Sequence, residues 1–389
     1  MPRLRFPGFE GEWKFVPFGS IIRETNLRTN IENEDILLSA AIEGMFLNSE
    51  LFDHQRGASN KGYKKIKLRT LVLSTQNLHL GNANVNLRFE HGIVSPAYKT
   101  YEVVGCDPVL LGQWVKTGKA KKFFFDATTV GASVCRRNVE WDTLYQQQLC
   151  LPTENEQHKL ADFLSLLTDR ISSQQRLVEI LKKHKRGLHS AIFGQKCRVV
   201  NADGKPWPAW RQARIGDIFQ ERSERGGTAD ELLSVTINNG VKRQADTDKK
   251  DSSSEDKSNY KKVLPGDIVY NTMRMWQGAS GVSPWAGIVS PAYTVIYPRG
   301  RQNTTFWAYA FKYWRLIQEF QKFSQGLTSD TWNLKYPQLS DIRVYEPSMD
   351  EQEAIVDILS ILDERVSAAE QELNKMRNLK SGLLQQLFI

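Results

Sequence analysis

The feature that most constrains the fold is an internal repeat whose period is half the chain. The segment Gly92-Ile93-Val94-Ser95-Pro96-Ala97-Tyr98 returns unchanged at 287–293, which is 195 residues later. Three further pairs share this offset: 37–39 with 232–234, 156–157 with 351–352, and 167–170 with 362–365. The period far exceeds the roughly 20–50 residues of solenoid and propeller repeats. Each copy is therefore expected to be a full domain, and two related domains suggest two related ligands.

Length and composition limit the class of protein. A chain of 389 residues has room for two or three domains, each with its own core. The apolar runs are too short to cross a bilayer and the first residues carry no apolar signal core, so we expect a cytoplasmic protein with no membrane partner. The net charge of +8 favours nucleic acid as a partner, although a basic protein without such a partner can have the same composition.

Each copy ends in a stretch with coiled-coil periodicity. Steps of four and three from Leu160 reach ten positions, eight of them apolar, and the same positions 195 residues later include nine apolar residues. The first seam is Leu160, Leu164, Leu167, Ile171, Gln174, Val178, Leu181, Lys185, Leu188 and Ile192. The second is Ile355, Leu359, Leu362, Val366, Ala369, Leu373, Met376, Lys380, Leu383 and Leu387.

Two helices of this length need partners along their apolar seams. A helix of about 40 residues spans roughly 60 Å, and the other copy is the obvious partner. The first helix leaves the first domain and arrives at the second, so equivalence of the copies requires the second helix to return. We therefore expect an antiparallel pair with a pseudo-twofold axis. The alternative is that each helix packs on its own domain.

The remainder of each copy indicates an α/β domain. Stretches rich in Val, Ile and Tyr predict strands at 70–73, 93–104, 267–270 and 288–297. Residues 305–323 predict one aromatic-rich helix, whose rings form either core or, less favoured, a platform for stacked bases. The segment 245–259 is a polar, charged loop. The expected fold class is α/β, with two tandem α/β domains joined and spaced by two long antiparallel coiled-coil helices in pseudo-twofold symmetry.

Sequence motifs for catalysis are missing. The chain has no G-x-G-x-x-G, no H-E-x-x-H and no Asn-Pro-Pro-Tyr or Asp-Pro-Pro-Tyr segment. The segment 112–119 differs from a P-loop in the spacing of its glycines and in the Ala120 that follows. The four cysteines form no C-x-x-C, and no histidine occupies a duplicated position. We expect no catalytic, cofactor-binding or metal-binding residue. A stand-alone nuclease or methyltransferase with an unrecognised site and a coiled-coil protein adaptor stay open as alternatives.

The duplicated layout resembles the specificity subunit of type I restriction-modification enzymes. The carriers are P-x₃-E-Q at 152–157 and 347–352, the L-x-D/E-R segments at 167–170 and 362–365, Gly266–Tyr270 and the two seven-residue repeats. The resemblance covers essentially the full length. It implies two target-recognition domains at 1–152 and 211–347, spacer helices at 153–194 and 348–389, and a linker at 195–210.

That resemblance also implies function and partners. Each domain would recognise one half of a bipartite, asymmetric site in double-stranded DNA, and the helix pair would set the gap between the halves. Two methyltransferase (modification) subunits carrying S-adenosylmethionine would dock on the chain and methylate adenine. Restriction subunits with helicase and nuclease activity, using ATP and Mg, would join them. This chain would hold no cofactor and supply targeting alone.

Candidate DNA-binding residues follow a strand that is matched between the copies. An offset of 197 aligns 71–77 with 268–274, and within this segment the copies diverge into polar residues after a well-matched strand. Side chains suited to base contacts there are Gln76, Asn77, Asn271, Arg274 and Gln277, unless these segments are ordinary polar loops. Lysine pairs suited to phosphates follow a tyrosine in each copy, although solvated lysine pairs are equally common: Lys64 and Lys65, Lys261 and Lys262.

Overall fold

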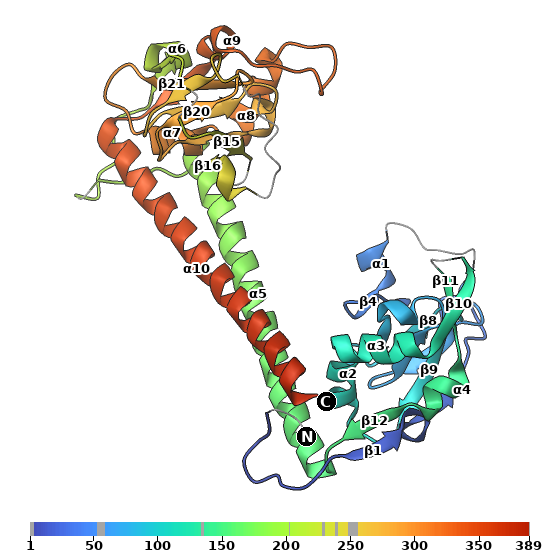
Figure 1. Ribbon diagram of the computed structural model, residues 1–389. Helices are drawn as coiled ribbons and strands as arrows, with labels where there is room; N and C mark the ends of the chain where they lie inside the picture. The colour runs from blue at the N-terminus through green and yellow to red at the C-terminus, as the bar shows by residue number, and fades with distance from the viewer. Residues whose placement is uncertain are drawn as a thin grey trace. The chain divides into compact units, whose positions relative to one another are not determined.

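The chain forms two compact units in the computed structural model (Figure 1). The structure describes residues 4–52, 59–133, 136–201, 203–227, 230–237, 240–247 and 256–388, so Cys135 and part of the polar loop at 245–259 lie outside the described residues. Unit 1 comprises Met1–Arg176 with Glu370–Ile389, and unit 2 comprises Leu177–Ala369. Within the described residues, no helix combines the length and apolar character needed to cross a membrane.

Unit 1 is built around a four-stranded antiparallel sheet. Its order is β2 (Ile22–Thr25), β9 (Tyr98–Val103), β6 (Leu71–Ser74) and β7 (Ala83–Val85). Four antiparallel pairs surround it: β1 (Lys14–Pro17) with β12 (Gln148–Leu151), β3 (Leu38–Ala40) with β4 (Met45–Leu47), β5 (Lys64–Lys67) with β8 (His91–Val94), and β10 (Thr128–Ser133) with β11 (Arg136–Val139). The short helices are η1 (Phe18–Ile21), α1 (Asn48–Leu51), η2 (Leu78–Leu80), α2 (Pro108–Trp114), α3 (Gly118–Asp126) and α4 (Trp141–Gln146).

Unit 2 repeats this plan. Its sheet has the order β14 (Phe219–Glu221), β21 (Tyr293–Pro298), β18 (Ile268–Asn271) and β19 (Ser280–Val282). Its pairs are β13 (Arg211–Arg214) with β22 (Arg343–Glu346), β15 (Leu233–Thr236) with β16 (Gly240–Arg243), and β17 (Lys261–Val263) with β20 (Gly287–Val289). Its short helices are α6 (Ile215–Ile218), η3 (Gln244–Asp246), η4 (Met275–Gln277), α7 (Thr304–Ala310), α8 (Trp314–Phe323) and α9 (Tyr336–Ser340).

The two long helices contribute to both cores. Helix α5 spans Glu154–Phe193 and helix α10 spans Met349–Leu387. In unit 1 the core holds Leu160 and Leu164 of α5 together with Leu387 of α10. In unit 2 it holds Ile192 of α5 together with Ile355 of α10. Each core therefore needs one helix from each copy.

Reciprocal lysine contacts show the direction of the helix pair. In unit 2, Lys185 forms an ion pair with Asp363. In unit 1, Lys380 Nζ donates to Thr168 Oγ1 at 2.7 Å. Positions 168 and 363 are equivalent in the repeat, as are 185 and 380, so the two contacts correspond. Arg377 also donates to Gln175 at 2.8 Å, so the numbering falls along α10 as it rises along α5. No seam residue of either helix is exposed. The expected fold class is confirmed, and α10 lies along α5 in Figure 1.

The glutamate of the repeated Glu-Gln pair is a buried anchor at the start of each long helix. Glu156 is 0% exposed and pairs with Arg5, whose Nε lies 2.7 Å from its carboxylate. Glu351 is also 0% exposed and pairs with Arg198 at 2.9 Å. A buried carboxylate is costly unless a cation and hydrogen bonds satisfy it. The pairing therefore accounts for the return of this residue in both copies.

The glutamine of the same pair joins the long helix to a short one. Gln157 accepts a hydrogen bond from the backbone N–H of Asp107, the N-cap residue of α2, at 2.8 Å. Its amide donates to the Pro152 carbonyl at 3.0 Å. The second copy has the same two bonds, from Asn303 to Gln352 and from Gln352 to Pro347. The spacing P-x₃-E-Q thus has a structural cause.

Two repeated motifs lie against each other, which explains why both recur. In unit 1 the Ile93 N–H donates to the Ile36 carbonyl at 2.9 Å, so the strand holding the Gly-Ile-Val motif runs beside the Leu-Leu-Ser motif. A Cβ atom on Gly92 would lie 2.5 Å from Leu38 Cδ1. The equivalent Cβ on Gly287 would lie 2.4 Å from the Glu231 carbonyl oxygen. A side chain at either position would therefore displace its neighbours.

Two expected elements are each divided in the structure. The strands expected at 93–104 and 288–297 break at a turn, in which Tyr98 N–H donates to the Ser95 carbonyl at 3.1 Å and Tyr293 N–H to the Ser290 carbonyl at 3.0 Å. The proline between them lacks an N–H and favours this turn position. The helix expected at 305–323 is two helices, α7 and α8, because Tyr313 has an extended backbone with φ −72° and ψ 127°.

Candidate nucleic-acid interface

The candidate base-contacting loops begin at the same support in both units. In unit 1 the Thr75 backbone N–H and Oγ1 both donate to the Ala97 carbonyl, at 3.2 and 2.8 Å. In unit 2 Thr272 makes the same two bonds to Ala292, at 3.1 and 2.9 Å. The carbonyl belongs to the Ser-Pro-Ala-Tyr turn of the repeated motif. That motif therefore holds the start of each loop in an equivalent position.

The loops also end alike, which supports the offset of 197 used to align them. Asn77 precedes η2 and Arg274 precedes η4, each as the N-cap residue of its 3₁₀ turn. The turns end at Gly81 and Gly278, with φ of 92° and 80°. These left-handed values favour glycine. Asn77 and Arg274 thus hold one structural position and carry different side chains.

The proposed base-contacting residues differ in exposure. Gln76, Asn77 and Arg274 are exposed, whereas Asn271 and Gln277 are half-buried. The side-chain oxygen of Asn271 accepts the Met273 N–H at 3.0 Å, so it already shapes the loop. Gln76, Asn77 and Arg274 therefore have the most accessible side chains of the five.

The loop of unit 2 has a neighbour that the sequence analysis missed. Residues 324–335 hold Trp332, whose ring meets that of Trp276 edge to face at 5.1 Å. The Leu334 N–H donates to the Thr272 carbonyl at 2.9 Å, and Leu327 is fully exposed. Unit 1 has the hairpin β10–β11 at the corresponding point of the chain. In the sequence, Trp332 within an otherwise polar segment containing Gly, Ser and Thr was the signal that could have indicated this neighbour.

The four lysines expected to contact phosphates are buried or lie near carboxylates. Lys64 is only 5% exposed, and burial lowers the pKa of its ammonium group. Lys65 forms an ion pair with Glu34. Lys261 lies 3.1 Å from Glu221, and Lys262 lies 3.6 Å from Glu224. Each of the four lysines thus already has a neighbour that burial or an ion pair provides, and their contact with phosphates stays a prediction.

A different lysine recurs in both copies and donates to neutral oxygens in each, and the sequence analysis did not single it out. Lys312 Nζ donates to the carbonyls of Ile237, Gly278 and Ser280. Lys116 in unit 1 donates to Ile42, Ala83 and the Asn84 side chain. Burial lowers the pKa of both ammonium groups to about 8. Gly278 ends the loop that carries Arg274, so Lys312 fastens that end of the loop.

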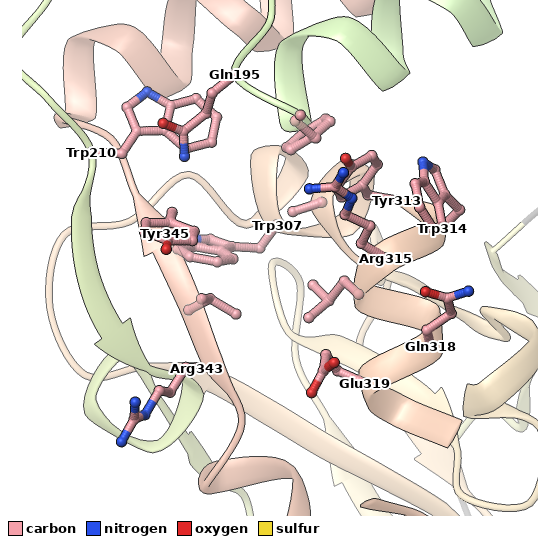
Figure 2. Close-up of a pocket in the computed structure, with 15 residues that line it drawn as sticks. Gln195, Trp210, Trp307, Tyr313, Trp314, Arg315, Gln318, Glu319, Arg343 and Tyr345 are labelled. Atoms are coloured by element: carbon pink, nitrogen blue, oxygen red, sulfur yellow. The ribbon is translucent and has the colours of Figure 1, made fainter. Parts of the chain in front are cut away.

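Unit 2 also has an aromatic pocket of about 340 Å³ between α8, β22 and the end of α5. Figure 2 shows Trp210, Trp307 and Tyr345 on one side and Arg315, Gln318 and Glu319 of α8 on the other. Among its described lining residues, Glu319 is the single carboxylate, and there is no histidine or cysteine. Across the described part of the chain, no group of three His, Cys, Asp or Glu side chains is placed to hold a metal ion.

The fold and the paired loops define a protein with two tandem α/β domains and two long antiparallel helices. Residues 209–377 match the family described as type I restriction modification DNA specificity domain. The second copy is therefore a type I restriction-modification specificity domain, and the resemblance predicted from the sequence is confirmed.

Solved structures share this fold. The type I restriction-modification S subunit from M. genitalium matches with a TM-score of 0.60 and 16% identity, over 100% of this chain and 99% of that one. A chain from a study of complex assembly and conformational transition of the type I R-M system matches at 0.55 and 15%, over 97% and 98%. The HsdS subunit from Thermoanaerobacter tengcongensis matches at 0.49 and 16%, over 99% and 97%. A search of curated protein sequences finds no match.

Proposed function

We propose that the chain is the DNA-recognition subunit of a type I restriction-modification complex and that each unit recognises one half of a bipartite, asymmetric site. One observation carries the proposal. Two loops with the same support and the same 3₁₀ turn present different exposed side chains, Gln76 and Asn77 in one and Met273 and Arg274 in the other. Arginine suits guanine and asparagine suits adenine in the major groove, so the two loops favour different bases.

The long helices suit the role of a spacer. The core of unit 1 contains the end of α10, and the core of unit 2 contains the end of α5. Both helices therefore connect the units. The helices have 40 and 39 residues, and their seams are buried or half-buried. We propose that their length sets the gap between the half-sites.

Exposed aliphatic side chains on these helices suit a protein partner. Leu166 of α5 is 70% exposed and Ile361 of α10 is 56% exposed. The two positions are 195 residues apart and thus equivalent in the repeat. Equivalent surfaces bind equivalent partners, so we propose one methyltransferase subunit at each. That partner would bind S-adenosylmethionine, and restriction subunits using ATP and Mg would complete the complex in the cytoplasm. This chain would supply no catalytic residue.

Leu166→Asp and Ile361→Asp are each expected to remove one copy of the methyltransferase. A charge cannot enter an apolar contact without losing its hydration, whereas the folded chain itself tolerates aspartate at these exposed positions. Mass measurement of the purified complex should give two partner copies for the wild type, one for each single variant and none for the double variant. Glu364→Asp, an exposed substitution on α10 that conserves charge, is the control. Two copies retained by the double variant would place the docking surface elsewhere.

Methylome sequencing of a host that carries this chain and its modification partner tests the function itself. We expect methylated adenines at a split site with two different halves. Four residues inserted after Gln174, with four more after Ala369 to keep the helices in register, add about 6 Å and close to one turn. The gap should then change while both halves stay the same.

The same experiment separates the alternatives. Methylation by the chain without a partner would support a stand-alone enzyme and contradict the proposal. Methylation at the original gap with undiminished efficiency in the insertion variant would contradict the spacer role alone. Methylation without any sequence preference when the chain is present with its modification partner would favour a protein adaptor.

A further inference from the structure

The segment 324–335, here called the arm, joins α8 to α9 in unit 2 and lies beside the loop that follows β18. The backbones of Gln325 and Asn333 exchange two hydrogen bonds, of 3.0 and 2.8 Å, so the arm is an antiparallel ribbon closed at its base. Leu334 follows, is buried in the core of unit 2, and donates its N–H to the Thr272 carbonyl at 2.9 Å. The base of the arm and the start of the loop are therefore held together.

The turn of the arm is fixed by its own hydrogen bonds. The N–H and Oγ1 of Thr331 both donate to the Thr328 carbonyl at 2.9 Å, and the Thr328 N–H donates to Thr331 Oγ1 at 3.1 Å. Gly326 has a φ of 141°, and a Cβ atom there would lie 2.6 Å from the Thr331 carbonyl oxygen. Because this backbone is already ordered, the arm loses little conformational freedom when it meets a partner.

A leucine stands at this turn with its side chain in water. Leu327 is the most exposed of the large apolar residues that the structure describes. Met273, in the neighbouring loop, is exposed as well. The arm itself carries no net charge, because Asp330 and Lys335 cancel. A partner that binds the arm would therefore be held by apolar contact more than by charge.

The first copy has an arm at the same point of the chain. Strands β10 and β11 stand between α3 and α4, as the arm of unit 2 stands between α8 and α9. Val130 of β10 is also exposed. The two arms differ in sequence and in secondary structure, yet each keeps an aliphatic side chain in water. That shared property favours contact with a ligand over packing within the unit.

We propose that Leu327 inserts as an apolar wedge between two base pairs at or beside the second half-site. The inference rests on the proposed function. Stacked base faces are the apolar surface that duplex DNA offers, and leucine is among the side chains that proteins insert between base steps. The bond from Leu334 to Thr272 ties the arm to the loop of Arg274, so a duplex held by that loop meets the arm as well.

The wedge would add specificity without reading a base edge. Pyrimidine–purine steps unstack more easily than other steps, so the free energy of insertion depends on the sequence at that step. We expect the wild type to prefer TA, CA or TG at one position beside the bases that Arg274 recognises. Leu327→Ala should lose this preference and keep the preference that depends on Arg274.

The test compares Leu327→Ala with the wild type in the complete complex. The DNA carries 2-aminopurine, whose fluorescence rises on unstacking, at one position at a time across and beside the second half-site. We expect a rise at one step with the wild type and none there with the variant. The methylated adenine is left out, because the methyltransferase itself turns that base out of the stack.

Affinity gives a second measurement. Leu327→Ala should bind about tenfold more weakly, since burial of a leucine side chain contributes roughly that much. The slope of log K against log salt should stay the same, because a leucine makes no phosphate contact.

Leu327→Met should keep both the fluorescence rise and the affinity, because methionine also serves as a wedge. Ser329→Ala is the matched control, since Ser329 is exposed in the same turn and offers no apolar side chain. A wild type without an unstacked step, or a Leu327→Ala complex with wild-type affinity, would overturn the inference and leave the bipartite recognition intact. Loss of a partner subunit from the variant complex would also overturn it, in favour of a protein contact at the arm. A wild-type complex without sequence preference would overturn the proposed function, and this inference with it.

Discussion

Asp267→Thr is expected to lower the free energy of unfolding of unit 2 by about 3 kcal/mol, since removing one partner of a buried ion pair leaves the other charge uncompensated. Asp267 holds Arg222 through two hydrogen bonds, of 2.7 and 2.9 Å, and the two side chains are 4% and 10% exposed. Glu224 stays as a second partner of Arg222 at 3.0 Å, so we expect the lower end of the range measured for such pairs.

The first copy supplies the control for this experiment. Thr25 and Thr70 stand where the second copy has Arg222 and Asp267. Thr70 Oγ1 accepts the Lys67 N–H at 3.1 Å, as Asp267 accepts the Leu264 N–H at 2.8 Å, so threonine keeps the turn.

The double variant Arg222→Thr/Asp267→Thr should therefore be more stable than Asp267→Thr alone. Hydrogen exchange measured by mass spectrometry, resolved by peptide, will show whether protection falls in unit 2 only. A double variant less stable than the single one would mean that the threonine pair cannot replace the ion pair in this unit.

Arg274→Ala should relax recognition of one base pair in the second half-site and leave the first half-site unchanged. A bidentate arginine–guanine contact contributes about 1–3 kcal/mol of discrimination. Arg274 is exposed at the start of η4. It holds the position in unit 2 that Asn77 holds in unit 1, and both loops begin at an equivalent hydrogen-bonded threonine. Binding titrations on DNAs varied one base at a time measure the effect.

Two further variants make this result specific. Asn77→Ala should affect the first half-site only, because it holds the equivalent position in unit 1. Lys261→Ala with Lys262→Ala should change no base preference, since both lysines are paired with carboxylates. If Arg274→Ala weakens every sequence equally, the residue contacts phosphate rather than a base.

The architecture was predictable because the sequence contains two copies of the same pattern. Matching segments at one offset required two domains, and the seams from Leu160 and Ile355 required helices with a partner. Chain connectivity then gave the antiparallel direction without any knowledge of side-chain contacts. The loops after 71–74 and 268–271 were found in the same way, by comparing the copies until they diverged.

Other features depend on neighbours that lie far away in the sequence. The Val- and Tyr-rich pattern continues through the turn at Ser95, so composition alone could not divide the strand. Lys261 and Lys262 looked available for phosphates because their partners, Glu221 and Glu224, lie about 40 residues earlier. The three carbonyls around Lys312 come from separate segments and leave no pattern in the sequence.

The shared helix ends also bear on how the chain is made. Synthesis proceeds at about 5–20 residues per second, so roughly 11 to 45 s separate the appearance of Leu160 from that of its core neighbours near Leu387. Throughout that interval the apolar face of α5 has no partner from α10, and the nascent first unit exposes surface on which chaperones act. A chain released before α10 is complete would lack Leu387 and its neighbours, so the core of unit 1 would stay unfinished.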